Sequence, residues 1–163
     1  MLSTRLVEMI QKHADQLMEG LVCKLKSDPK TPSYHHLSSN EIFSRSDTIL
    51  RNLGAWMEGN LHDKMQHHYK EFGAFFRQQS IPLHEMVYAL ILTKNHLLDY
   101  ARTYGLAGSV LDIYAELGLQ RQLGHFFDDA IYYAALGYEK MPASTAKAAA
   151  QSFGATPEEL ARL

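Results

Sequence analysis

The sequence has few residues that cross-link or interrupt a chain, and it carries no excess of one charge. One cysteine occurs among 163 residues, which excludes an internal disulfide and favours a reducing compartment such as the cytoplasm. Sixteen Lys and Arg stand against 18 Asp and Glu, so the formal net charge is −2 at pH 7. This balance provides no positive field for a polyanion, and we expect no nucleic-acid partner.

Long apolar runs and β-type patterns are also missing. No apolar run approaches the roughly 20 residues of a membrane-spanning helix, and the N-terminal segment turns polar too early for a secretory signal. We find no period-2 run of apolar residues bounded by hairpin turns. The five prolines all lie near predicted element boundaries, and the stretches between them show helical periodicity. The sequence therefore predicts an all-α fold without a membrane span.

The apolar residues recur at helical spacing in five long segments, and a chain of this length can bury about 70% of its unfolded surface in one core. Ser38 with Glu41, and Ser109 with Asp112, have the spacing of capping boxes, which place two helix starts. Gly59-Asn60 is expected to end the second helix and Gly105 to cap the fourth. The predicted helices cover about residues 3–26, 38–58, 61–79, 82–104 and 110–137.

The C-terminal part of the sequence differs in composition. Residues 142–156 are rich in Ala and Ser and poor in large apolar groups, which is typical of a linker. Thr156, Pro157 and Glu159 then have the pattern of a helix start. We expect one helical domain at residues 1–141, followed at 142–163 by a linker and the start of a helix that leads to a further domain; a frayed chain end is the alternative.

The fifth predicted helix is apolar on two sides, so it either lies at the centre of the domain or is shared with a partner. We expect a symmetric homodimer through the second side; the alternative is that another helix of the same chain covers it. The first side consists of Ile113, Leu117, Phe127, Ile131 and Ala134. The second side, the predicted dimer interface, consists of Leu119, Leu123, Phe126, Ala130 and Tyr133.

Nine histidines raise the question of a metal or haem site. The chain has no paired Glu-x-x-His motifs, no His-x-x-x-His and no His-Glu-x-x-His, so we predict no metal ligands. Haem requires only one imidazole in an apolar pocket. His68 and His96 are the candidates, because both have apolar helical neighbours. A haem-binding gas or redox sensor is therefore the alternative function, and a helical metal-dependent enzyme is the second alternative.

Catalytic motifs are absent. Cys23 stands on a predicted helix with no motif around it, and the glycines before Ser109 are not followed by the lysine of a phosphate-binding loop. We therefore predict no catalytic residues and a function other than that of an enzyme.

Several short motifs resemble the N-terminal domain of RsbR-type proteins, the RsbT co-antagonists of bacterial stressosomes. The likeness extends over about residues 3–140. It is carried by His13-Ala-Asp-Gln-Leu-Met, Leu25-Lys-Ser-Asp-Pro, Tyr34, Leu37, Glu41, Ile81-Pro-Leu-His-Glu-Met-Val-Tyr-Ala-Leu, Phe126-Phe-Asp-Asp-Ala-Ile-Tyr-Tyr and Gly137-Tyr-Glu.

This resemblance implies a globin-like domain, generally without haem, that dimerises and senses an input. In that family the domain usually precedes a STAS output domain, and related domains precede histidine kinases. We therefore expect a cytoplasmic bacterial sensory domain that needs no cofactor. As a homodimer it would transmit its signal by helix repacking to an output domain or a separate signalling protein, with a small ligand or a partner contact as the input.

Overall fold

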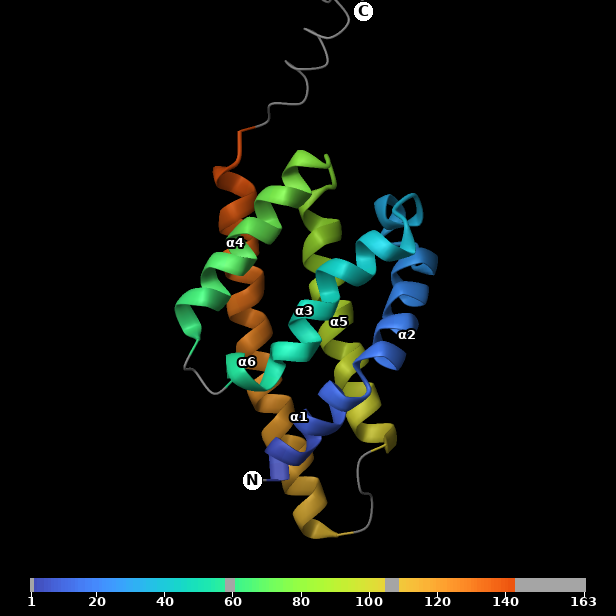
Figure 1. Cartoon of the computed structure of the whole chain (residues 1–163), viewed down its shortest axis with the longest axis vertical. Helices are drawn as coiled ribbons and strands as arrows, with labels where there is room; N and C mark the ends of the chain where they lie inside the picture. Colours follow the sequence, from blue (N-terminus) through green and yellow to red (C-terminus); the bar gives the residue numbers. More distant parts are fainter. Residues whose placement is uncertain (1, 58–60, 105–108, 143–163) are drawn as a thin grey trace, which may run out of the picture.

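The computed structural model describes residues 2–57, 61–104 and 109–142, and every regular element in these residues is helical (Figure 1). Six α-helices and one short 3-10 helix follow one another along the described chain. The prediction of an all-α fold is confirmed. The elements are α1 (Leu2–Lys12), α2 (Ala14–Ser27), η1 (Pro32–His35), α3 (Ser39–Met57), α4 (His62–Gln78), α5 (Leu83–Tyr104) and α6 (Val110–Lys140).

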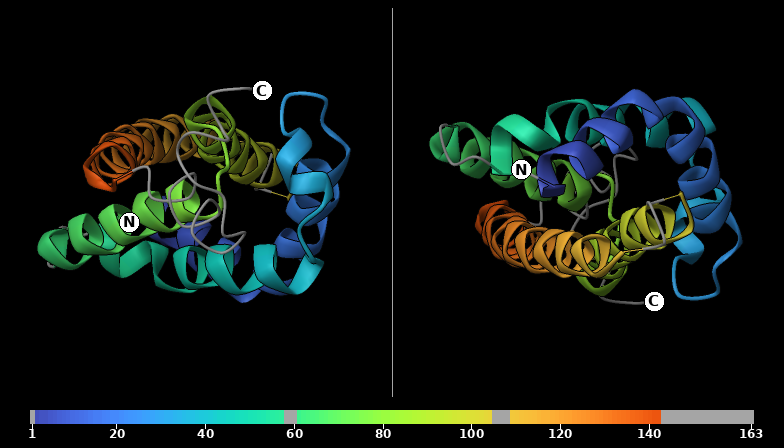
Figure 2. Two further views of the ribbon diagram at one scale, coloured as in Figure 1. Left: turned by 90° about the horizontal axis from the view of Figure 1, so that it is seen from above. Right: turned by 90° about the horizontal axis from the view of Figure 1, so that it is seen from below.

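The helices form two layers, which are seen end-on in Figure 2. Helices α5 and α6 lie side by side in one layer, α1, α3 and α4 form the other, and α2 closes one edge. α6 runs along most of the molecule, with α4 against its C-terminal half and α1 against its N-terminal half (Figure 1). One hydrophobic core fills the space between the layers, and Tyr69, Met86 and Phe127 are among its fully buried side chains.

Two helix starts lie where the capping-box spacing places them. The Ser38 N–H donates to Glu41 Oε2 at 2.9 Å, and the Glu41 N–H donates to Ser38 Oγ at 3.2 Å. The same arrangement precedes α6. The Ser109 N–H donates to Asp112 Oδ2 at 3.0 Å, and the Asp112 N–H donates to Ser109 Oγ at 3.2 Å. The Glu41 carboxylate accepts hydrogen bonds from Ser38, and these bonds lower the pKa of Glu41. Both predicted starts are therefore confirmed.

The first predicted helix, over residues 3–26, consists of two helices. The chain bends at His13, where φ is −106° and ψ is 24°. The His13 N–H donates to the Met9 carbonyl (3.1 Å), and the Leu17 N–H donates to the His13 carbonyl (3.0 Å), so the break is a change of direction rather than a loop. The bend allows α1 to pack against α3 and α6 while α2 packs against α3 and α5. The prediction of one continuous helix over residues 3–26 is therefore wrong.

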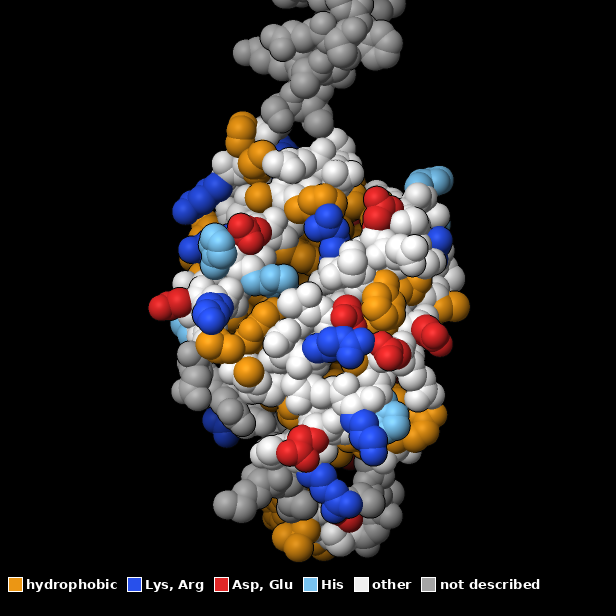
Figure 3. All heavy atoms as spheres, in the orientation of Figure 1, with side chains coloured by type: hydrophobic (Ala, Val, Ile, Leu, Met, Phe, Trp, Pro, Cys, Tyr) orange, Lys and Arg blue, Asp and Glu red, His pale blue; other side chains and the backbone are white. Residues whose placement is uncertain are grey.

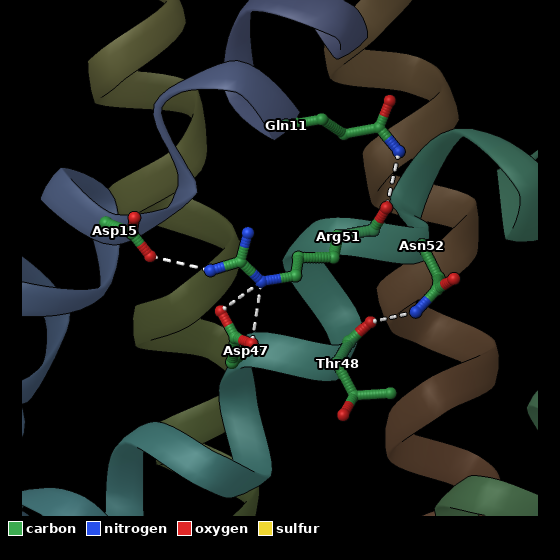
Figure 4. A network of polar contacts seen from close by, with 6 residues as sticks. All are labelled: Gln11, Asp15, Asp47, Thr48, Arg51 and Asn52. Carbon is green, nitrogen blue, oxygen red and sulfur yellow. Dashed lines mark hydrogen bonds and ion pairs between the residues drawn. The ribbon is translucent and has the colours of Figure 1, made fainter.

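Arg51 of α3 connects the bend to its own helix (Figure 4). Its Nη2 donates to Asp15 Oδ1 at 2.6 Å, and its Nε donates to Asp47 Oδ2 at 2.7 Å. The Arg51 carbonyl accepts a bond of 2.8 Å from Gln11 Nε2 at the end of α1. Because Asp15 and Arg51 are largely exposed, these ion pairs set the position of the bend more than they stabilise the fold.

α4 and α6 cross at two glycines that face the backbone of the opposite helix. A Cβ at Gly73 would overlap the Ala134 carbonyl, and a Cβ at Gly137 would overlap the Lys70 carbonyl. Only glycine permits this approach. The predicted end of the last helix at Gly137 is therefore wrong, because α6 continues to Lys140 and this glycine serves the helix crossing.

Some predicted features lie outside the described residues. They are the helix break at Gly59-Asn60, the cap at Gly105 and, apart from Pro142, the linker and helix start at residues 142–163. Within the described helices, none is both long and apolar enough to cross a lipid bilayer.

Candidate functional site

The side of α6 expected to form the dimer interface is buried within the chain. Leu119, Leu123 and Ala130 are fully buried, Phe126 is 6% exposed, and Tyr133 is half-buried. Aromatic rings of α3 and α4 pack on Phe126. The predicted dimer interface is therefore wrong, and the alternative, coverage by other helices of the same chain, is what the structure has. The close α4–α6 crossing is the physical reason, because it turns this side of α6 toward α4.

Exposed apolar surface lies instead at the N-terminal end of α6. The exposed fractions range from 55% at Leu117 to 68% at Val110 and Tyr114. Hydrophobic side chains are visible at the lower end of the molecule in Figure 3, near the start of α6 in Figure 1. We call this surface the α6 end patch; it comprises Tyr104 of α5 and Val110, Leu111, Ile113, Tyr114 and Leu117 of α6.

The end patch arises because the first turns of α6 extend toward one end of the bundle. In this segment Ala115 and Leu119 face the core, so the opposite side of the helix is left exposed. Ile113 and Leu117 belong to the first predicted apolar side. Further along the same side Phe127 is fully buried, so only the N-terminal part of that side lacks a covering helix.

His68 of α4, the first haem candidate, is enclosed by aromatic rings. Its ring centroid lies 5.1 Å from that of Trp56 and 5.3 Å from that of Tyr69. Nε2 is buried and has no hydrogen-bond partner. Burial lowers the pKa of His68, and Glu71 offsets only part of this effect, so the imidazole is neutral at pH 7.

His96 of α5, the second candidate, connects α5 to α2. Its Nε2 lies 2.8 Å from the Leu17 carbonyl, so Nε2 carries the proton and donates it to that oxygen. The ring covers Gly20, where a Cβ would come within 3.0 Å of the imidazole Cε1. Burial lowers the pKa of His96 as well, and the bond to Leu17 opposes the shift.

The two histidines stand on different helices, and neither presents an unbonded Nε2 to open space. A haem iron would have to replace the Leu17 bond of His96 or part the rings around His68. Haem binding is therefore a prediction without geometric support in this arrangement. Among the described residues, no three His, Cys, Asp or Glu side chains gather as a metal site would require, and Cys23 is exposed on α2.

Because of His68 and His96, we expect the stability of the fold to decrease in acid. Because their folded-state pKa values lie below the unfolded value near 6.5, the unfolded chain binds more protons as the pH falls through that value. The free energy of unfolding should therefore decrease progressively as the pH falls below about 6.5. Urea unfolding at these pH values tests this. His68→Phe should flatten the decrease, the exposed His125→Gln control should retain it, and an unchanged slope in His68→Phe would contradict the assignment.

Glu85, in the first turn of α5, is a buried carboxylate to which sequence reasoning assigned no role. It is 3% exposed. Its Oε2 accepts the Ser33 N–H at 2.8 Å, and its Oε1 accepts the Ser33 hydroxyl at 2.9 Å. These bonds hold η1 against α5. The only signal in the sequence is one acidic residue in an apolar helical stretch. Acidic residues are also common in the first turn of a helix, so this signal does not distinguish a buried carboxylate from an ordinary helix start.

Comparison of the chain with protein-family models, with curated proteins and with solved structures yields no significant match. The resemblance to RsbR-type domains therefore stays a prediction from its motifs. Any functional assignment depends on the surfaces, the buried polar groups and the helix packing described above.

Proposed function

We propose that the chain is a sensory domain of a cytoplasmic bacterial signalling protein and that it acts as a homodimer. In this proposal it is globin-like, as the resemblance to RsbR-type domains implies, and it functions without a cofactor or catalytic residue. Its signal passes by helix repacking to an output domain of the STAS or histidine-kinase type, or to a separate signalling protein.

The α6 end patch is the observation that carries the proposal. A two-fold interface uses the same surface on both copies, so one exposed patch is sufficient for a closed dimer. The ion pair between Arg102 Nε and Glu116 Oε1, at 3.1 Å, flanks the patch with polar groups, as is usual at an interface rim.

α6 also provides a physical route for the signal. The helix carries the patch on its first turns and packs into the core from Leu119 to Tyr138. A change in how two copies pack at the patch therefore acts on the α4–α6 crossing through one continuous helix. An input that binds two such arrangements with different affinity shifts their populations.

Leu117→Glu tests the dimer. The substitution places a charge at the patch, where burial of an unpaired carboxylate should weaken association at least 100-fold. Sedimentation velocity at roughly 1–100 μM protein should show a dimer for the unchanged chain and a monomer for the variant. Leu117 is 55% exposed, so the fold itself should be retained.

Tyr132→Glu is the matched control. Tyr132 is 61% exposed on α6 and, fifteen residues further along, lies about 22 Å from Leu117 at the helical rise. This variant should remain dimeric. A strictly monomeric unchanged chain over the whole concentration range would overturn the proposal. Loss of the dimer in Tyr132→Glu would overturn the assignment to the end patch.

A further inference from the structure

The contact between α3 and α4 consists mainly of side chains. α3 packs chiefly on α1 and α2, whereas α4 packs chiefly on α6. Arg45 of α3 lies over the Phe75 ring of α4 at one end of the contact. At the other end the His68 ring contacts Trp56 of α3 and Tyr69 of its own helix. Of these five groups, only the imidazole changes its charge near neutral pH.

The surroundings of His68 suit the neutral imidazole and not the imidazolium. Nε2 is buried and has no hydrogen-bond partner. The imidazolium carries an N–H on both ring nitrogens, so protonation places a charged donor where no acceptor stands. A buried charge without a partner costs far more free energy than a neutral polar atom in the same place. Because the side chain is only half-buried, a change of rotamer is enough to carry the charged ring to solvent.

The charged neighbours of His68 all lie on the exposed side of α4. Glu71, one turn further along, raises the pKa of His68, and His67 lowers it, while burial lowers it most. Glu71 Oε1 lies 3.2 Å from His67 Nε2, and both side chains are largely exposed. Lys64, one turn before His68, is exposed as well. Once His67 is protonated, Glu71 pairs with it and is less available to a charge on His68.

The side chains that pack around His68 from the described parts of the other helices carry no charge. Trp56 comes from α3, and Phe126 of α6 packs on both Trp56 and Tyr69. Tyr69 is fully buried, and burial raises its pKa, so its hydroxyl stays protonated. Among these rings no carboxylate offsets a charge on His68, so only its exit to solvent relieves the cost of protonation.

We propose that His68 is a proton-operated switch of the contact between α3 and α4. The neutral imidazole stays among the aromatic rings; the imidazolium turns to solvent, and Trp56 loses the ring on which it packs. Trp56 also packs on Phe126 at 6.1 Å, so the change reaches α6, the helix that carries the end patch. This inference rests on the proposed sensory function and deepens it, because it names a fall in pH as an input.

The fluorescence of Trp56, the sole tryptophan, tests the switch on the unchanged chain. As the pH is lowered from about 8 to 5, the emission maximum should move to longer wavelength, because the indole gains contact with water. The midpoint should lie below about 6.5, the ordinary value of histidine. Far-ultraviolet circular dichroism should show that the helix content is retained across the transition, which separates the switch from unfolding.

Substitutions at His68 and at its two charged neighbours test the assignment. His68→Phe keeps a ring but binds no proton, so the emission shift should disappear. His68→Arg carries a charge at every pH and should show the acid emission already at about pH 8. His67→Gln is the matched control on an exposed position; it should keep the shift and raise its midpoint by a few tenths of a pH unit. Glu71→Gln should lower the midpoint by a similar amount.

The link to the end patch is tested by dimerisation. Sedimentation velocity should give dimer dissociation constants that differ about threefold or more between pH 7.5 and pH 5.5, and His68→Phe should abolish this difference. Leu117→Glu, which lacks the proposed dimer contact, should retain the emission shift. Failure of the switch is therefore distinguishable from failure of the dimer.

Three outcomes would overturn the switch. The first is an emission shift that persists in His68→Phe. The second is a midpoint above about 6.5, which would mean that the aromatic rings hold the imidazolium in place by cation–π contact. The third is a dimer of the unchanged chain whose dissociation constant is the same at both pH values, since protonation would then leave α6 unaffected.

Discussion

Gly73→Ala and Gly137→Ala are each expected to lower the free energy of unfolding by about 4 kcal/mol or more, enough to unfold a marginally stable domain. The added Cβ would overlap a backbone carbonyl of the opposite helix, Ala134 for the first variant and Lys70 for the second. A flexible side chain could move aside, but a carbonyl inside a helix cannot. The helices must therefore separate, and the buried contacts between α4 and α6 are lost with them. Urea unfolding followed by circular dichroism measures the effect.

Gly118→Ala and Gly124→Ala are the matched controls, both on α6. A Cβ at either position meets no atom within 4 Å. Alanine is preferred to glycine in a helix interior by about 0.5–1 kcal/mol, so both controls should raise the free energy of unfolding by that amount. If Gly73→Ala and Gly137→Ala were as stable as these controls, the close crossing of α4 and α6 would be wrong.

Glu85→Ala is expected to lower the free energy of unfolding by about 3 kcal/mol. The substitution removes both acceptors of Ser33 and leaves its N–H and hydroxyl without partners at a part-buried position. Loss of these bonds should also release η1 from α5, so the amides around Tyr34 should exchange with solvent faster. Chemical denaturation and hydrogen exchange measure the two effects.

A double-mutant cycle with Ser33→Ala isolates this interaction from the remaining consequences of removing the carboxylate. The two substitutions should be non-additive by about 1–2 kcal/mol, because either one already breaks the hydroxyl bond. Glu85→Gln retains one acceptor and should cost less than Glu85→Ala. Additive losses, or unchanged exchange around Tyr34, would show that Glu85 does not hold η1.

Local signals in the sequence were sufficient for most helices. The two capping boxes and the spacing of apolar residues placed the starts of α3 and α6 correctly, because these signals involve neighbours within one turn. The bend at His13 has no such signal. No proline or glycine stands there, and the change of direction follows from packing against helices distant in the sequence.

The choice between the two apolar sides of α6 could not be made from periodicity. Both sides contain large apolar residues, and the helix with which each packs is decided by the crossing at Gly73 and Gly137. The spacing of apolar residues predicts a helix end near Gly137, whereas α6 continues through this glycine to Lys140.

The aromatic cluster around His68 gives the chain an optical reporter of its own. Trp56 is the sole tryptophan, and its ring lies 5.1 Å from His68 and 6.1 Å from Phe126 of α6. All indole fluorescence therefore originates where α3, α4 and α6 meet, so the intensity and wavelength of its emission will register both protonation of His68 and any displacement of α6. Helix repacking can thus be followed in the unlabelled protein with a fluorimeter.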